Sequence, residues 1–170
     1  MSAELGPVRI RKARPGEAHA IAALNNRFAD EALMLPRTPD AVALSIDDYV
    51  VAATPRGRVV GCGALKEYSP SLAEVAAVAV AEEARGRGLG REIVTAVEAL
   101  ARKRGVRELF ALTLEPAFFE AIGYARADRA CYPEKIRRDC VGCSRRASCA
   151  EVCLAKRLEE PAAGCGRRAA

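Results

Sequence analysis

The stretch Arg85-Gly86-Arg87-Gly88-Leu89-Gly90 decides how the rest of the chain is interpreted. It follows an apolar run, Val75 to Val80, and precedes an amphipathic helical pattern from Arg91 to Arg104. Glycine lets the backbone approach a ligand, and the first N–H groups of a helix have no partner within the helix. The stretch therefore predicts an anion site at a helix start, with a basic surface turn as the alternative.

The spacing of this loop excludes two common phosphate-binding loops. No Gly-Lys-Ser/Thr follows it, so it is not a P-loop, and Arg91 stands where the dinucleotide fingerprint needs its last glycine. The spacing that remains is Arg-x-x-Gly-x-Gly, formed by Arg85, Gly88 and Gly90.

Bulk properties favour one globular domain. The chain has 170 residues, of which 51% are hydrophobic and 29% charged, enough to bury a core. The net charge is +5, and residues 134–170 carry nine Lys or Arg against five Asp or Glu. Because nearly all the excess charge is local, a broad nucleic-acid-binding face is not expected.

Nothing in the sequence indicates a membrane or a secreted protein. No apolar run reaches about 18 residues, and residues 1–12 lack the apolar core of a signal peptide. We therefore expect a cytoplasmic protein that does not bind membranes. In that compartment the seven cysteines indicate thiols or metal ligands rather than a disulfide framework.

The periodicity of apolar residues predicts an α/β fold around a mixed sheet flanked by helices. Three successive strands precede the glycine loop, which is unlike a repeating βαβ array. Strands are expected at 8–13, 49–53, 58–66, 74–80, 108–114 and 124–127, and helices at 18–30, 40–44, 91–104 and 117–122. We expect residues 1–130 to form the main domain, 131–158 a cysteine-rich extension of it, and 159–170 a disordered tail.

Five motifs resemble one family. They are Met34-Leu35-Pro36-Arg37, the strand from Ala73 to Val80, the glycine loop, the run from Leu112 to Tyr124, and Tyr132-Pro133-Glu134-Lys135 with the cysteine segment after it. Their order is similar to that of the GNAT acetyltransferases, and in detail to the stand-alone form of N-acetylglutamate synthase. The resemblance implies a GNAT acyl-CoA N-acyltransferase fold and transfer of acetyl from acetyl-CoA to the α-amino group of L-glutamate, the entry step to arginine synthesis. The second interpretation keeps the fold and the cofactor but has another amino acid as acceptor, for example a glutamate-like toxic amino acid.

The resemblance also assigns the cofactor site. The pyrophosphate of acetyl-CoA is expected on the loop, formed by Arg85, Gly86, Arg87, Gly88, Leu89, Gly90 and Arg91. The pantetheine arm is expected to pair with the backbone of Val78 and Val80.

The acceptor requires a base and cations. An α-ammonium group must lose a proton before its nitrogen can attack a thioester, and Glu74, at the start of the central strand, is the candidate base. The substrate carboxylates require basic partners, for which Arg37, Lys135 and Arg137 are the candidates. Each of these residues could instead be an ordinary surface charge.

Two features depart from the family pattern. Many GNAT enzymes carry a tyrosine acid in the helix after the fifth strand, where this chain has Phe118 and Phe119, so Tyr124 is the remaining candidate acid. Many members of the narrower family carry an arginine near Ala76, where this chain has small residues. The second departure concerns the choice of glutamate over another amino acid.

Four cysteines within 14 residues form the last motif. Cys140, Cys143, Cys149 and Cys153 are candidate ligands of a structural zinc, because soft thiolates suit tetrahedral zinc and Cys-x2-Cys is a common zinc-knuckle spacing. Cys149 and Cys153 share a face if residues 150–158 are helical. Packed reduced thiols and a redox disulfide are the alternatives, and a zinc module that binds a partner on a GNAT scaffold is a further interpretation of the whole chain. A homodimer is possible.

Overall fold

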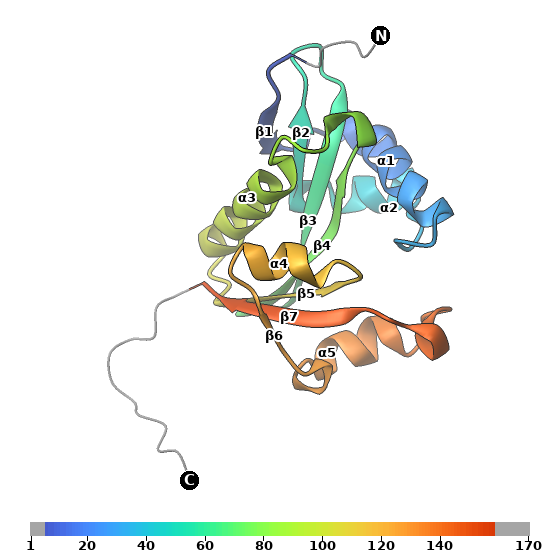
Figure 1. The fold of residues 1–170 in the computed structure, drawn as a ribbon, viewed down its shortest axis with the longest axis vertical. Coiled ribbons are helices and arrows are strands. Elements are labelled where there is room, and N and C mark those ends of the chain that lie inside the picture. Colours follow the sequence, from blue (N-terminus) through green and yellow to red (C-terminus); the bar gives the residue numbers. More distant parts are fainter. Residues whose placement is uncertain (1–5, 159–170) are drawn as a thin grey trace.

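One mixed sheet of seven strands organises the molecule (Figure 1). The computed structural model describes residues 6–158. The strands are β1 (Arg9–Lys12), β2 (Tyr49–Ala53), β3 (Val59–Ser69), β4 (Leu72–Val80), β5 (Glu108–Thr113), β6 (Ala125–Arg126) and β7 (Val152–Arg157), in the spatial order β1-β2-β3-β4-β5-β7-β6. The helices are α1 (Ala18–Asp30), α2 (Pro39–Leu44), α3 (Leu89–Lys103), α4 (Pro116–Ala121) and α5 (Pro133–Lys135). The predicted fold class is confirmed.

Strands β1 to β4 form an antiparallel half-sheet with helices on both faces. Figure 1 shows α1 and α2 on one side of it and α3 on the other. Apolar residues at helical spacing, such as Ile21 on α1 and Ile93 on α3, are fully buried against the sheet. Gly63 on β3 permits the close approach of α3, since a Cβ there would lie 2.6 Å from a methyl carbon of Ile93.

The two central strands separate along their length. β4 and β5 are parallel neighbours, but they pair only from Leu72 to Glu74 with Glu108 to Phe110. Beyond these residues β4 continues to Val80 and β5 to Thr113 without pairing to each other. The divergence leaves β4 beyond Glu74 and β5 beyond Phe110 unpaired on the sides that face each other.

The C-terminal segment differs from the sequence expectation. Residues 150–158 were considered as a helix, but Val152–Arg157 forms β7, which pairs antiparallel with the whole of β5 and places β6 at the edge. The preceding turn, Ile136–Cys140, is π-helical and continues α5. Tyr132 stacks on Phe110 of β5 with ring centroids 4.4 Å apart, so the segment is fixed to the sheet where β4 and β5 separate.

The expected tail at 159–170 lies outside the described residues. None of the described helices is both long and apolar enough to cross a membrane.

Candidate active site

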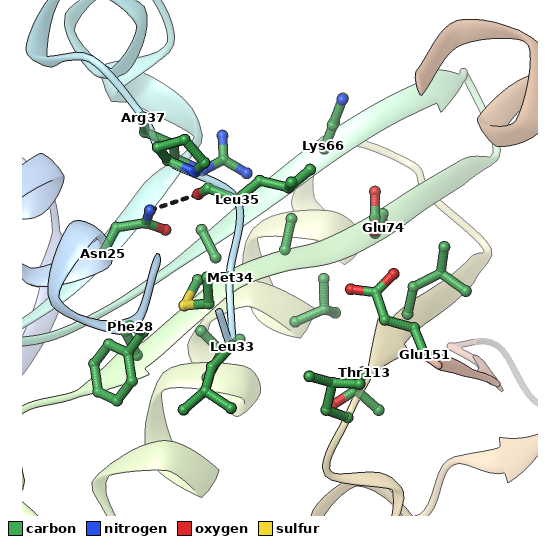
Figure 2. A pocket seen from close by; sticks show the side chains of 18 of the residues that line it. Asn25, Phe28, Leu33, Met34, Leu35, Arg37, Lys66, Glu74, Thr113 and Glu151 are labelled. Carbon is green, nitrogen blue, oxygen red and sulfur yellow. Dashed lines mark hydrogen bonds between the residues drawn. The ribbon is translucent and has the colours of Figure 1, made fainter. Parts of the chain in front are cut away.

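A cavity of about 1190 Å³ occupies the gap between the separated strands. Its walls come from the end of α1, the loop before α2, β4, the end of β5, the start of α4 and the C-terminal segment. Figure 2 shows Arg37 and Lys66 on one side, Glu74 on β4, and Thr113 and Glu151 on another side. Five chain segments that are distant in sequence therefore meet at one site.

The glycine loop lies at one end of this cavity. Gly86 and Gly88 have φ values of +74° and +77°, a conformation that other residues adopt only with strain. Gly88 immediately precedes α3, whose first N–H groups have no acceptor within the helix. Arg85 lines the cavity, and its guanidinium lies 5.3 Å from the centre of the Phe28 ring. The loop has the local geometry that an anion site requires.

Gly90 permits the close approach of α3 and α4. A Cβ at this position would lie 3.2 Å from the ring of Phe118, which belongs to α4 on the far side of the cavity. The glycine and the phenylalanine thus bring α3 and α4 together at the cavity wall. This contact gives Phe118 a packing role.

A bulge interrupts β4 inside the cavity. The register with β3 shifts between Cys62 and Ala64, so that Ala77 and Val78 together oppose Gly63. Ala77 has a φ of +52°, and its carbonyl accepts a hydrogen bond of 3.4 Å from the Cys62 thiol. A bulge takes backbone groups out of the ladder and turns them toward a neighbouring space. Val78 and Val80, the predicted pantetheine contacts, both line the cavity.

Glu74 is the buried carboxylate of the cavity. Its side chain is 6% exposed, its Oε2 atom accepts a hydrogen bond of 2.8 Å from Lys135 Nζ, and the same atom lies 2.8 Å from Tyr68 Oη. No described residue donates a hydrogen bond to Oε1. The carboxylate is therefore held by one oxygen, while the other is available to a ligand.

Asp139 joins the same cluster from the π-helical turn. Its Oδ2 atom lies 2.6 Å from Lys66 Nζ, 3.1 Å from Lys135 Nζ and 2.5 Å from Tyr68 Oη. Partial burial opposes ionisation, but the hydrogen bonds from Lys66 and Tyr68 and the charge of Lys135 lower the pKa of Asp139 to about 2. Burial lowers the pKa of Lys135, and Glu74 and Asp139 more than compensate, so that pKa is raised. The cluster contains two carboxylates and two ammonium groups.

Arg37 is positioned by the end of α1. The Asn26 side chain accepts from the Arg37 N–H at 2.9 Å and donates to the Arg37 carbonyl at 2.9 Å. Asn25 donates to the Leu35 carbonyl at 2.9 Å, the dashed line of Figure 2. Two adjacent asparagines therefore fix the proline-bounded loop and direct Arg37 to the cavity.

A second cavity of about 310 Å³ adjoins the first. Arg37, Lys66, Ala76 and Arg138 line both. Arg138 donates to the Glu67 carbonyl at 2.9 Å, and its guanidinium lies 5.3 Å from the centre of the Tyr68 ring. The boundary between the cavities is thus a cationic region around a small residue, Ala76.

The other two candidate substrate contacts, Lys135 and Arg137, differ in their position relative to the cavities. Lys135 reaches the cavity, but its ammonium group is bonded to Glu74 and Asp139. Arg137 is exposed and lines neither cavity, whereas its neighbour Arg138 lines both. On a helical turn adjacent residues point in different directions, and the sequence alone does not decide which one faces the site.

Tyr124, the candidate acid, is not at the cavity. It is 3% exposed, its ring packs on Phe119, and its hydroxyl is buried without a hydrogen-bond partner among residues 6–158. Burial and the nearby Glu98 raise its pKa well above the usual value. Tyr124 is a core residue, because the turn after α4 directs it inward.

The cysteines do not form the predicted zinc site. Among residues 6–158 no group of three or more His, Cys, Asp or Glu side chains is arranged to hold a metal ion. Cys153 is buried on β7 beside Phe110, and Cys149 accepts a hydrogen bond of 3.4 Å from Arg129 instead. Because β7 is extended, Cys149 and Cys153 do not lie one helical turn apart. The donor set does not fit zinc in this arrangement.

Comparison with known proteins identifies the family. The family model described as the acetyltransferase (GNAT) family matches residues 19–128. The chain belongs to the GNAT acetyltransferase family. It is an acetyl-CoA-dependent N-acetyltransferase, and CoA or acetyl-CoA is present in solved structures of similar fold.

Three known proteins illustrate what this chain is similar to in sequence or in structure. An uncharacterized N-acetyltransferase of Chlorobaculum tepidum is 39% identical over 149 residues, which cover 88% of this chain and 96% of the relative. An amino-acid acetyltransferase of Mycobacterium tuberculosis is 31% identical, covering 70% of this chain and 69% of the relative. The N-acetylglutamate synthase of Neisseria gonorrhoeae, solved with coenzyme A and N-acetyl-glutamate, is 27% identical with a TM-score of 0.80 over 91% of this chain. The present chain covers only 36% of the length of that synthase.

Sequence reasoning missed four residues of this site: Lys66, Tyr68, Arg138 and Asp139. The signals for three of them were present. Lys66 faces Glu74 across the β3–β4 hairpin, and Tyr68 lies two residues further along β3 on the same face. Asp139 lies four residues after Lys135, the spacing of a helical ion pair.

Proposed function

We propose that this GNAT enzyme acetylates the α-amino group of an amino acid, and that this amino acid is L-glutamate. The observation that carries the proposal is the set of residues that line the cavity of about 1190 Å³. The anion loop lies at one end, the buried carboxylate Glu74 lies at its middle, and the cations Arg37, Lys66 and Arg138 lie beside it. Two of the relatives compared above are named for amino-acid acetylation or glutamate acetylation.

The loop and the open edge of β4 suit acetyl-CoA. The pyrophosphate would bind the loop from Arg85 to Arg91, through the guanidinium of Arg85 and the first N–H groups of α3. The pantetheine arm would pair with β4 near Val78 and Val80, where β5 has diverged. This placement brings the thioester to the bulge at Ala77, where a backbone N–H group outside the ladder would donate a hydrogen bond to the oxyanion of the tetrahedral intermediate.

Glu74 supplies the base in this proposal. The ammonium of the acceptor gives a proton to Glu74, directly or through a water, and the free amine attacks the thioester carbon. The C–S bond then breaks, and the second proton of the nitrogen leaves with or toward the CoA thiolate. Tyr124, the predicted acid, does not supply this proton, since it faces the core.

The cations define the class of acceptor. Arg37 and Arg138 present guanidinium groups, which bind carboxylates through two parallel hydrogen bonds. Both residues line the second cavity as well, where the side chain of the acceptor can extend. An acceptor with two carboxylates matches this wall, and its product, N-acetylglutamate, would enter arginine synthesis.

A neutral amino acid as acceptor is the second candidate. Ala76 and Ala77 are small at the cavity boundary, where an arginine is common in the narrower family. The space beside these two alanines would accept an uncharged side chain larger than that of glutamate.

Initial rates of CoA release with single amino acids test the proposal. We expect the highest kcat/KM for L-glutamate, with L-glutamine, L-aspartate and D-glutamate at least about tenfold lower, because each loses one paired contact. Arg37→Ala should raise KM for L-glutamate about tenfold or more and leave KM for acetyl-CoA within about twofold. Equal rates for glutamate and glutamine would refute the glutamate assignment, and an effect of Arg37→Ala on acetyl-CoA alone would refute the role of Arg37.

A further inference from the structure

Tyr68 lies between two carboxylates. Its Oη atom lies 2.8 Å from Glu74 Oε2 and 2.5 Å from Asp139 Oδ2, both within hydrogen-bond distance. A tyrosine hydroxyl carries one hydrogen and can donate to only one acceptor at a time. The two contacts are satisfied together when one carboxyl group carries a proton and donates it to Oη, while the hydroxyl donates to the other carboxylate.

The two carboxylates differ in their access to water. The side chain of Glu74 is 6% exposed and faces the cavity, whereas that of Asp139 is 23% exposed. When the acceptor and acetyl-CoA fill the cavity, a proton on Glu74 is enclosed, whereas a proton on the more exposed Asp139 can reach solvent. Tyr68 is the group that connects them.

The charges around this path are nearly balanced. From β3 come Lys66 and Tyr68, and from the C-terminal segment come Lys135 and Asp139. β5 contributes the apolar ring of Phe110, 5.5 Å from the Tyr68 ring. The other neighbours are Arg138, over the Tyr68 ring, and the Cys153 thiol of β7, which interacts electrostatically with Glu74. Three cations and two carboxylates already leave the cluster slightly positive, so an added proton increases the positive charge and its release is favoured.

We propose that Tyr68 and Asp139 form the exit path for the proton that Glu74 removes from the acceptor. This inference rests on the proposed function only in taking Glu74 as the base for an amine acceptor. It does not depend on which amino acid is acetylated.

Each step of the path conserves atoms and charge. The protonated Glu74 carboxyl gives its proton to Oη of Tyr68 as the hydroxyl gives its own proton to Oδ2 of Asp139. Glu74 becomes a carboxylate again, Tyr68 stays neutral, and Asp139 becomes a carboxylic acid. Asp139 then releases the proton to water, and rotation of the Tyr68 hydroxyl restores the starting arrangement.

The acidities of the two groups agree with their order in the path. Burial and the adjacent carboxylates raise the pKa of Tyr68 far above its usual value, so a tyrosinate does not form. The pKa of Asp139 is about 2, so a proton that reaches it is lost to water at neutral pH. Tyr68 thus conducts a proton without storing one.

Kinetics of Tyr68→Phe test the path, with Tyr132→Phe as the matched control. Tyr132 is a second buried tyrosine that contacts Phe110 and donates to Glu108 at 2.7 Å, away from Glu74. We expect Tyr68→Phe to lower kcat about tenfold or more, to leave KM for the acceptor within about twofold, and to regain rate when imidazole is added as a small proton acceptor. Tyr132→Phe should keep the kcat of the unmodified enzyme. An unchanged kcat in Tyr68→Phe, or a loss that imidazole does not relieve, would overturn the path.

Infrared spectroscopy tests the same path without an acceptor. In the full chain with CoA, the C=O band of protonated Glu74 is identified in acid solution as the band that is absent in Glu74→Gln. The path predicts that this band shifts in Tyr68→Phe, which removes the group that accepts its proton, and stays in place in Tyr132→Phe. A band that is identical in all three proteins would contradict the path. If no amino acid is acetylated, the proposed function fails and the spectra still decide the path.

Discussion

Lys135 shows how the neighbours of a residue determine its task. Its position in the Tyr132-Pro133-Glu134-Lys135 motif suggested a contact with the substrate. In the structure its ammonium group donates hydrogen bonds to Glu74 at 2.8 Å and to Asp139 at 3.1 Å. A buried carboxylate without a cation nearby is costly, and Lys135 removes that cost for two carboxylates at once. The cations left to meet a substrate are Arg37 and Arg138.

Arg138 and its neighbour Arg137 allow a matched test of substrate binding. Arg138 lines both cavities and Arg137 lines neither. We expect Arg138→Ala to raise KM for L-glutamate about tenfold to hundredfold, the effect of losing a charge-assisted carboxylate contact. Steady-state kinetics of Arg137→Ala should match the unmodified enzyme. If both variants raise KM equally, net charge near the site rather than direct contact is responsible.

Strand β7 joins the cysteine-rich segment to the catalytic sheet. It pairs with β5 from Val152 to Arg157 and separates β5 from β6. The segment before it carries Lys135 and Asp139 to Glu74, and both ends of this connection are fixed, by the Tyr132 stack and by the strand. The C-terminal region is therefore a wall of the site.

The contacts of Asp139 predict how the free energy of unfolding depends on pH. The pKa of Asp139 is about 2, below its ordinary value of 3.8, so its ionised form stabilises the folded chain above about pH 4 and this stabilisation is lost as the pH falls through 2. Urea unfolding of the unmodified chain should lose about 1 kcal/mol more than Asp139→Asn between pH about 5 and about 2, a value that allows for partial solvent screening.

The control for this experiment is Asp47→Asn. The Asp47 side chain is 88% exposed and its ion pair with Lys12 spans 3.9 Å, so this variant should follow the unmodified chain at every pH. Parallel curves for Asp139→Asn and the unmodified chain would show that Asp139 does not stabilise the fold.

Local patterns were the predictable part of these elements. The glycine loop, α1, α3 and the β2–β3 hairpin follow from residues close together in sequence, and the structure has them where they were expected. β7 depends on partners about 40 residues away in β5, and Val152 to Arg157 carries no strict alternation that would distinguish a strand from a helix. The same non-local pairing explains why the cysteines could not be placed from their spacing.

The shape of the whole molecule follows from the separation of β4 and β5. Figure 1 shows two parts of the sheet at a large angle, with β1 to β4 in one part and β5, β7 and β6 in the other. Membership of the GNAT family accounts for acetyl-CoA as the cosubstrate, which we propose to bind at this opening. The proposed acceptor contacts, Arg37 and Arg138, come from segments distant in sequence, which no local pattern brings together.

A competition experiment tests the central claim most directly. The full chain is incubated with acetyl-CoA and an equimolar mixture of the twenty common L-amino acids, and the acetylated products are measured by mass spectrometry at early times. The account predicts N-acetylglutamate as the dominant product, and its formation should fall at least about tenfold in Glu74→Gln. A dominant product from a neutral or basic amino acid, or equal formation of N-acetylglutamate by Glu74→Gln, would contradict the account.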